Sequence, residues 1–191
     1  MKFYLRSFNK TISPEIREKI YDDAWQSNIN DFKFWFNKEK TTQLFSYKNN
    51  MFIASGGLTQ RIWQYYLFRC LEKTSPSKVL EIGSGNGINI CLFSSYFEEI
   101  NFTGIDISLK GVENSIKLKN KILDESFFLG WPLPLKNKKP GKISFEKCNA
   151  TKLNFNNQEF DFVYSILALE QMDDIKDKVI TEMVRVSNKY V

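Results

Sequence analysis

Apolar residues recur with two different spacings along the chain, and the change from one to the other predicts how the chain is organised. Over residues 1–77 most apolar positions follow the spacing of helices, whereas from Lys78 onward short apolar runs alternate with segments of helical periodicity. We therefore expect residues 1–77 to form a mainly helical extension or cap. Residues 78–191 are expected to form an α/β domain with a mostly parallel sheet and helices on both faces.

The N-terminal part carries several helix signals. Ser13 followed by Pro14 is typical of a helix start, and residues 28–36 carry aromatic side chains at helical spacing. Residues 48–57 predict a loop. The clearest amphipathic pattern follows this loop and ends at Ser75–Pro76. The core-facing side of that helix is expected to be Trp63, Tyr66, Leu67, Cys70 and Leu71, opposite Arg61, Gln64 and Lys73.

The second part predicts a regular alternation of strands and helices. Strands are expected at residues 79–82, 102–105, 142–148 and 160–164, with the opening of a fifth at 188–191. The helices between them have expected apolar faces at Ile88, Cys91 and Leu92, at Leu109, Val112, Ile116 and Leu123, and at Val179, Ile180, Met183 and Val184. Residues 124–141 form a long connection, whose aromatic side chains either cover a ligand site or pack on a neighbouring helix.

The composition excludes several kinds of chemistry. The chain has 191 residues, with 27 Lys and Arg against 22 Asp and Glu, and no histidine. Without imidazole it cannot form Ser-His-Asp or Cys-His catalytic groups, or most catalytic zinc sites. Its three cysteines, Cys70, Cys91 and Cys148, are widely spaced, as expected of buried free thiols in a reducing compartment rather than of disulfides or a metal site.

The apolar runs are shorter than a signal peptide or a membrane span requires. We therefore expect a soluble cytoplasmic protein without a membrane partner. The surplus of five positive charges is spread through Lys- and Asn-rich stretches rather than gathered into a stripe. A solvated surface explains this distribution better than a nucleic-acid interface.

A glycine-rich turn directly follows the first strand of the second part. In Glu81-Ile82-Gly83-Ser84-Gly85-Asn86-Gly87 the missing side chains let a ligand approach the backbone, and glycine tolerates the positive φ of a sharp turn. A dinucleotide-binding G-x-G-x-x-G motif requires a small last residue, but Ile88 occupies that position. Asp106 ends the next strand, where its carboxylate can bind the ribose hydroxyls of a dinucleotide or of another nucleoside ligand.

Four segments, in the same order, resemble the class I S-adenosylmethionine-dependent methyltransferases over about Lys78 to Val191. The glycine turn is the first, and Gly104-Ile105-Asp106-Ile107-Ser108 is the second. The third, residues 148–155, is similar to the family's Gly-Asp-Ala-x-x-Leu-Pro-Phe stretch. The fourth, residues 160–171, is similar to its fourth strand with a Leu-Glu-His ending. The resemblance implies a Rossmann-like fold and S-adenosylmethionine as the methyl donor.

The resemblance also implies roles for the matching residues. Glu81 would orient the amino end of the donor, and Asp106 would bind the ribose hydroxyls. Asn149 and Gln171 depart from the family pattern, which usually has Asp and His there; the Asn149 oxygen can still accept from the adenine amino group. The implied cofactor-binding residues are Glu81, Gly83, Ser84, Gly85, Gly87, Asp106, Ile107, Asn149, Ala150 and Ser165.

The implied reaction is methyl transfer to the oxygen or nitrogen of a small-molecule acceptor. A sulfonium donor is already activated, so positioning and the exclusion of water can supply most of the acceleration without histidine. If the acceptor loses a proton, Glu170 and Tyr164 are the nearest candidate bases, although a structural role is favoured for each. No metal is expected.

Several alternatives stay open. The chain can be a non-catalytic S-adenosylmethionine-binding subunit, an NAD-binding oxidoreductase, which Ile88 disfavours, or a methyltransferase of RNA or protein. The family's later strands are missing, so we expect truncation at the fifth strand, with a protein partner or a dimer covering the free sheet edge. Aromatic residues of the N-terminal part either cap an acceptor pocket or pack in the core: Trp25, Trp35, Phe36, Tyr47 and Trp63.

Overall fold

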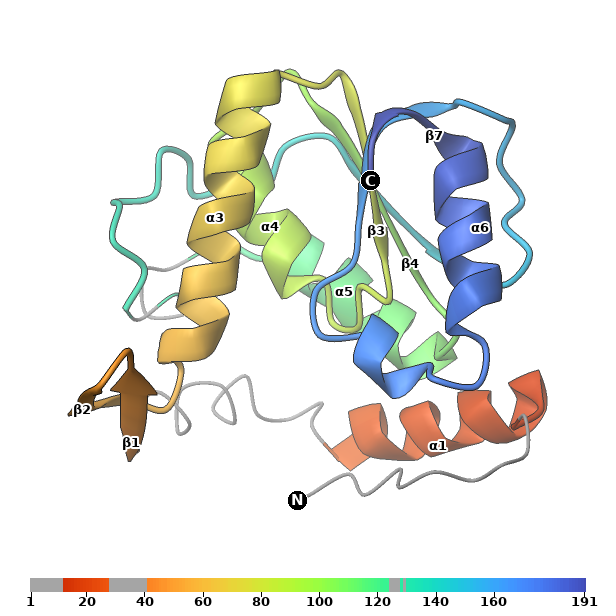
Figure 1. The fold of residues 1–191 in the computed structure, drawn as a ribbon. Coiled ribbons are helices and arrows are strands. Elements are labelled where there is room, and N and C mark those ends of the chain that lie inside the picture. Colours follow the sequence, from red (N-terminus) through yellow and green to blue (C-terminus); the bar gives the residue numbers. More distant parts are fainter. Residues whose placement is uncertain (1–11, 28–40, 124–127, 129) are drawn as a thin grey trace.

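A five-stranded parallel sheet forms the centre of the computed structural model, which describes residues 12–27, 41–123, 128 and 130–191 (Figure 1). The strands lie in the order β5-β4-β3-β6-β7, and each neighbouring pair is parallel. Their bounds are β3 Lys78–Ile82, β4 Asn101–Asp106, β5 Ile143–Lys147, β6 Phe160–Tyr164 and β7 Ser187–Tyr190. The predicted Rossmann-like α/β sheet and all five of its predicted strands are therefore confirmed.

Helices cover both faces of this sheet (Figure 1). The helices α3 (Leu58–Thr74), α4 (Ile88–Ser94) and α5 (Leu109–Lys119) lie on one face, and α6 (Lys176–Val186) lies on the other. Successive side chains of β3 point to opposite faces, so Val79 enters the apolar cluster beneath α3 and α4, while Leu80 enters the cluster beneath α6. Each face of the sheet thus buries its own core.

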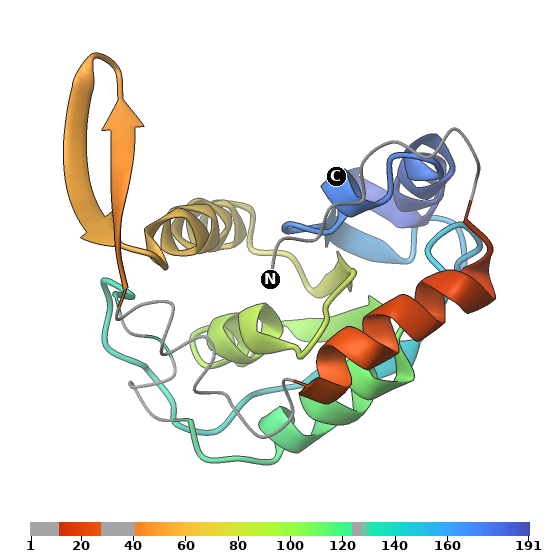
Figure 2. The same cartoon turned by 90° about the horizontal axis from the view of Figure 1, so that it is seen from below.

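The order of the strands creates a crevice at the carboxyl ends of the strands. From β3 the chain proceeds to β4 and β5 on one side, and it then returns to β6 and β7 on the other. Ligands of open α/β sheets bind at this point, outside the carboxyl ends of the strands. Helix α1 (Pro14–Ser27) runs across this end of the sheet (Figure 2).

Polar contacts hold α1 against both halves of the sheet. The Arg17 guanidinium donates to both carboxylate oxygens of Asp174, at 2.6 and 2.8 Å, in the loop between β6 and α6. On the other side, Asp22 Oδ1 accepts from the Ser108 hydroxyl at 2.6 Å and from the backbone N–H of Lys110 at 3.0 Å, at the start of α5. The helix therefore bridges the crevice.

The prediction of a loop over residues 48–57 is wrong for residues 50–55, which form the second strand of a β-hairpin. β1 (Thr42–Tyr47) pairs antiparallel with β2 (Asn50–Ser55), and the hairpin projects away from the sheet (Figure 2). Apolar residues lie on both of its faces, with Phe45 stacked on Phe52 on one face and Leu44 opposite Ile53 on the other. Because both faces carry apolar residues, the sequence lacks the alternation of apolar and polar positions that identifies a strand. Residues 28–36, including Trp35 and Phe36, lie outside the described residues.

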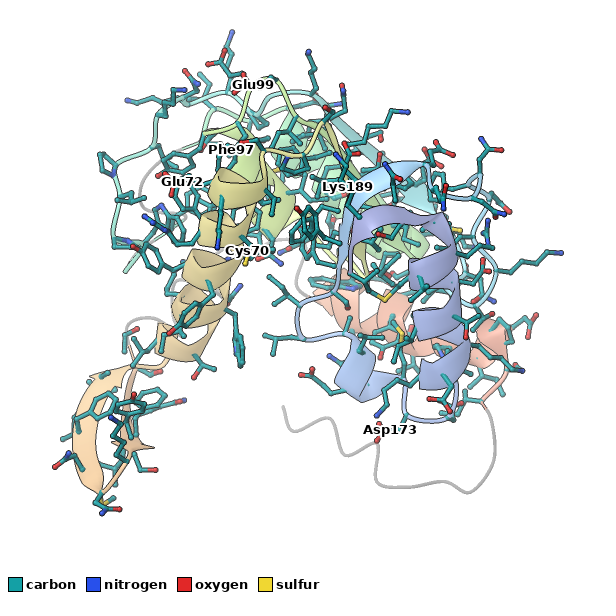
Figure 3. All side chains as sticks on the ribbon, turned by 45° about the horizontal axis from the view of Figure 1, so that its top comes forward. Cys70, Glu72, Phe97, Glu99, Asp173 and Lys189 are labelled. Atoms are coloured by element: carbon teal, nitrogen blue, oxygen red, sulfur yellow. The ribbon has the colours of Figure 1, made fainter. Side chains whose placement is uncertain are left out.

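Helix α3 is confirmed, but the predicted core face is largely wrong. Arg61 and Gln64 are buried, whereas Trp63 and Tyr66 are 52% and 65% exposed. Cys70, which we expected to be buried, is also exposed (Figure 3). Amphipathic patterns assign polar side chains to solvent, but here Arg61 Nη1 donates to Gln64 Oε1 at 2.5 Å, and both residues turn into the core. Because the Arg61–Gln64 pair is buried, a different face of α3 contacts the core than the face that the apolar pattern predicts.

The predicted apolar faces of α5 and α6 are also partly exposed. α5 ends at Lys119 rather than reaching Leu123. Four expected core residues are between 40% and 59% exposed: Leu109, Ile116, Ile180 and Val184. Each helix contacts the sheet through a narrower stripe than the sequence suggests. No helix in the described part of the chain is long and apolar enough to cross a membrane.

The aromatic residues of the long connection pack on helices rather than on the crevice. The Trp131 ring lies 5.7 Å from that of Phe68 in α3, and its Nε1 donates to the Tyr96 hydroxyl at 2.8 Å. Phe128 is buried in the same apolar cluster. Of the two predicted roles for residues 124–141, packing is therefore confirmed for these two aromatic residues. Residues 124–127 and 129 lie outside the described part.

Replacing Asp174 with Ala tests how α1 is held. The Arg17 side chain is 4% exposed, so the substitution leaves a buried charge without its carboxylate. We expect the free energy of unfolding to fall by about 3 kcal/mol. The matched control is Asp173→Ala, because Asp173 is 80% exposed and its pair with Lys176 contributes less than about 1 kcal/mol (Figure 3). Urea unfolding measures both, and equal losses would contradict the role assigned to Asp174.

Candidate functional site

A cavity of about 500 Å³ lies at the carboxyl ends of the strands, beneath α1. The connections after β5, β4, β3 and β6 line it in that spatial order, with Asn149 at one end, Asp106 next, then the glycine turn, and Ile166 to Ala168 at the other end. Its volume is within the range of small-molecule and cofactor sites. Side chains of α1 complete the lining: Arg17, Tyr21, Ala24 and Trp25.

The glycine turn is anchored to the neighbouring strand. The backbone N–H groups of Gly83 and Ser84 both donate to the carbonyl of Ile105 at 2.9 Å, which holds the turn beside the end of β4. Ser84 lines the cavity, and its buried hydroxyl has no hydrogen-bond partner among the described residues. A buried hydroxyl without a partner is costly, so this group is free to form a hydrogen bond with a ligand in the cavity.

Gly85 of the turn lies against Trp25 of α1. It adopts a φ of 54°, and a Cβ placed on it would lie 2.4 Å from the Trp25 ring. A larger residue would therefore be strained by its backbone and would also collide with the indole. Trp25 thus contacts the turn and lines the cavity, whereas Tyr47 and Trp63 are 66% and 52% exposed and do neither.

Asp106 joins the ends of two loops at the cavity floor. Its Oδ2 accepts from the backbone N–H of Gly85 and its Oδ1 from that of Ser108, both at 2.8 Å. Burial raises the pKa of this carboxyl, and the N–H groups of Ser108 and Gly85 partly oppose the increase. Each carboxylate oxygen can accept a second hydrogen bond, so the pair can bind two adjacent hydroxyls.

Asn149 lines the cavity and also closes the turn after β5. Its Oδ1 accepts from both the backbone N–H and the hydroxyl of Thr151, at 3.0 and 2.9 Å. These two hydrogen bonds use both lone pairs of the oxygen. The carboxamide NH2, rather than the oxygen that we expected to meet the adenine amino group, is therefore the group left to contact a ligand.

Glu81 lies beneath the cavity rather than in its lining. The side chain is 1% exposed and points to the face of the sheet covered by α3 and α4. Its Oε1 accepts from Asn89 Nδ2 at 2.7 Å, and Asn89 Oδ1 accepts from Gln64 Nε2 at 2.8 Å. Asn89 is the member of this group that reaches the cavity.

Burial raises the pKa of Glu81 to about 8, although Asn89 and Tyr164 act in the opposite direction. Burial and the neighbouring Glu81 also raise the pKa of the Tyr164 hydroxyl well above its ordinary value. A tyrosine that keeps its proton in an enclosed place is poorly suited to act as a base. Tyr164 lies outside the cavity lining, as does Glu170, which is exposed in the short helix η2 (Leu169–Gln171).

The structure gathers seven of the ten expected cofactor-binding residues around the cavity, namely Gly83, Ser84, Gly85, Asp106, Ile107, Asn149 and Ala150. Glu81, Gly87 and Ser165 do not line it. Gly87 begins α4 with a φ of 74°, and the Ser165 hydroxyl donates to the carbonyl of Ile82 at 3.0 Å.

Three lining residues carry no signal by which the sequence could have identified them, because elements distant in the sequence bring them to the cavity: Arg17, Tyr21 and Gln60. Asn89 was also missed, although it lies in the first turn of α4, two residues after Gly87.

Glu81→Gln tests the buried carboxyl. Between the ordinary pKa of 4.5 and about 8, the folded protein keeps a proton on Glu81 that the unfolded chain releases. The stability that this group contributes is therefore lost as pH rises across that window, by up to about 1.4 kcal/mol per pH unit. We expect the free energy of unfolding to fall less between about pH 5 and pH 8 in the variant than in the parent. Urea unfolding at both values measures this, and parallel losses would contradict the raised pKa.

The comparisons with known proteins agree with this geometry. Residues 80–189 match the model of a family described as a methyltransferase domain. No curated protein matches the chain at a significant level.

Several solved structures are similar to this chain over part of their length. The [4+2]-cyclase SpnF has a TM-score of 0.60 and 16% identity, covering 95% of this chain and 58% of its own. The YcgJ protein from Bacillus subtilis has a TM-score of 0.50 and 22% identity, and the match covers 65% of this chain and 45% of that protein. A SAM-dependent methyltransferase from Methanosarcina mazei has a TM-score of 0.46 and 27% identity, and the match covers 58% of this chain and 47% of that protein.

This chain spans about half the length of these solved proteins, and the first two of them show the fold alone. The family model, in contrast, matches more than half of the chain, from β3 to the end of β7. The chain therefore belongs to the methyltransferase domain family.

Proposed function

We propose that this chain binds S-adenosylmethionine in the cavity beneath α1 and transfers the methyl group to the oxygen or nitrogen of a small-molecule acceptor. The observation that carries the proposal is the Asp106 carboxylate, which is buried beside a positive-φ glycine turn at the point where the strand order reverses. Such a carboxylate suits two ribose hydroxyls, and the unpartnered Ser84 hydroxyl supports a polar ligand next to it.

The polarity of the cavity supports one orientation of the donor. Beside the end of β5, Ala150 and Ile107 provide apolar surface for an adenine ring, and Asn149 provides an amide at its edge. Asp106 lies next along the sheet, and the glycine turn and Asn89 follow. This sequence of apolar, hydroxyl-binding and polar surfaces corresponds to the adenine, ribose and amino-acid parts of S-adenosylmethionine, which supplies an activated methyl group when it is bound.

The acceptor would lie towards the connection after β6. Gln171 and Tyr21 line this part of the cavity, and the Tyr21 hydroxyl donates to Gln171 Oε1 at 3.1 Å. Burial raises the pKa of Tyr21, so its hydroxyl stays protonated and keeps its hydrogen bond to Gln171, while its oxygen can still accept one from a ligand. Because α1 covers the cavity and is attached on both sides, a small molecule suits this place better than a polymer. The chain's contribution to catalysis would be alignment and the exclusion of water.

Calorimetric titration tests the class of ligand. We expect S-adenosylmethionine and S-adenosylhomocysteine to bind and NAD to give no heat of binding. Binding of NAD without either sulfur ligand would contradict the proposal. Release of S-adenosylhomocysteine with a panel of hydroxyl and amine acceptors then tests catalysis, and donor binding without release on any acceptor would favour a non-catalytic subunit.

Asp106→Asn tests the ribose contact. The amide presents an NH2 in place of one accepting oxygen, so we expect the affinity for S-adenosylhomocysteine to fall at least about tenfold. The matched control is Asp173→Asn, because Asp173 is 80% exposed and lies outside the cavity lining. The midpoint of thermal unfolding without ligand shows whether each variant is folded. An unchanged affinity in a folded Asp106→Asn protein would mean that the ribose contact is assigned wrongly.

A further inference from the structure

Four polar side chains form a chain of hydrogen bonds between α3 and the centre of the sheet. Arg61 Nη1 donates to Gln64 Oε1 at 2.5 Å, Gln64 Nε2 to Asn89 Oδ1 at 2.8 Å, and Asn89 Nδ2 to Glu81 Oε1 at 2.7 Å. Their exposed fractions are 7%, 0%, 8% and 1%, in the order from Arg61 to Glu81. We call these four residues the polar relay.

The chemistry of its first member determines the direction of the whole relay. A guanidinium has no acceptor, so Arg61 can only donate, and Gln64 must present its carboxamide oxygen to it. The NH2 of Gln64 is then directed to Asn89, which must accept with its oxygen and present its own NH2 to Glu81. Each carboxamide therefore has a single orientation that satisfies its neighbours, and α3 imposes the orientation of Asn89.

Packing alone does not account for this arrangement. The relay lies beside the apolar cluster formed by α3, α4 and the sheet, where residues such as Phe68 and Phe93 are buried. Buried charged and polar groups often contribute less stability than apolar residues of the same volume. They are also harmful when one member lacks its partner. A relay that extends from α3 to the cavity is better explained by the group that it orients.

That group is the Asn89 carboxamide, since Asn89 is the relay member that lines the cavity. It lies beside the glycine turn, on the other side of Asp106 from Asn149. Its oxygen can accept one more hydrogen bond and its NH2 can donate one more. An ammonium group needs an acceptor and a carboxylate needs a donor, so this carboxamide suits the zwitterionic end of an amino acid.

Resting on the proposed function, we propose that Asn89 contacts the amino-acid end of the donor and that Gln64 is the positioning residue that orients it. Glu81 then acts through Asn89 rather than by touching the donor. Gln64 lies in α3, outside residues 80–189 that match the family model. Part of the donor site is therefore supplied by the N-terminal part of the chain.

Two substitutions at Gln64 interrupt the relay in different ways. Gln64→Met keeps the approximate shape of the side chain but removes both of its hydrogen bonds. Gln64→Glu keeps an acceptor for Arg61 and replaces the NH2 donor with an oxygen, so Asn89 must turn its own NH2 towards position 64. Because Gln64→Glu retains a hydrogen-bond acceptor for Arg61, we expect this variant to stay folded even if Gln64→Met does not.

Two ligands separate positioning from a general structural effect. S-adenosylhomocysteine carries the amino-acid end, whereas 5′-methylthioadenosine has the same adenosine and thioether but lacks that end. We expect both variants to bind S-adenosylhomocysteine about tenfold more weakly than the parent does, since a hydrogen bond to a charged group is lost. Calorimetric affinities for 5′-methylthioadenosine should stay within about twofold.

The control is Gln43→Met, the same substitution at an exposed position of the hairpin, which should leave both affinities unchanged. An unchanged affinity for S-adenosylhomocysteine in both Gln64 variants overturns the positioning role. An equal loss for both ligands also overturns it, because it shows a structural effect on the whole cavity. Failure of the parent protein to bind either ligand overturns the proposed function itself, and this inference with it.

Discussion

The buried carboxylate of Asp106 connects the parts from which the cavity is built. Its two oxygens accept backbone N–H groups from the glycine turn after β3 and from the start of α5 after β4. Two neighbouring connections are therefore held at a common point, and Trp25 of α1 can pack against Gly85 in the turn. Burial makes this charge costly, and the two N–H donors offset part of that cost. The remaining capacity of the oxygens to accept hydrogen bonds is directed to whatever enters the cavity.

The N-terminal part of the chain covers the crevice that the methyltransferase domain alone leaves open. A parallel sheet of this order has a crevice at the carboxyl ends of its strands. Here α1 bridges that crevice through the Arg17–Asp174 pair on one side and the Asp22–Ser108 contact on the other. The family match begins at β3, yet α1 supplies part of the cavity lining.

Helix α3 contributes in a different way, because it carries polar side chains into the core. Its Gln64 is fully buried, and the hydrogen bond to Asn89 connects it to the residue that reaches the cavity. The same polar face displaces Trp63 and Tyr66 to the surface. The orientation of the helix therefore follows from a hydrogen-bonded path rather than from the largest apolar stripe.

The sequence by itself determined the five strands of the parallel sheet, most of the helices and the position of the glycine turn after β3. Strands buried on both faces appear as short apolar runs, and a turn such as that around Gly85 needs glycine locally, so both signals lie within a few neighbouring residues. Tertiary structure alone decided which face of α3 is buried, that β1 and β2 pair, and that Arg17 and Gln60 reach the same cavity as the glycine turn. The physical reason is distance along the chain: the partner of Arg17 lies 157 residues away and that of Gln64 lies 25 away, so no local pattern encodes those contacts.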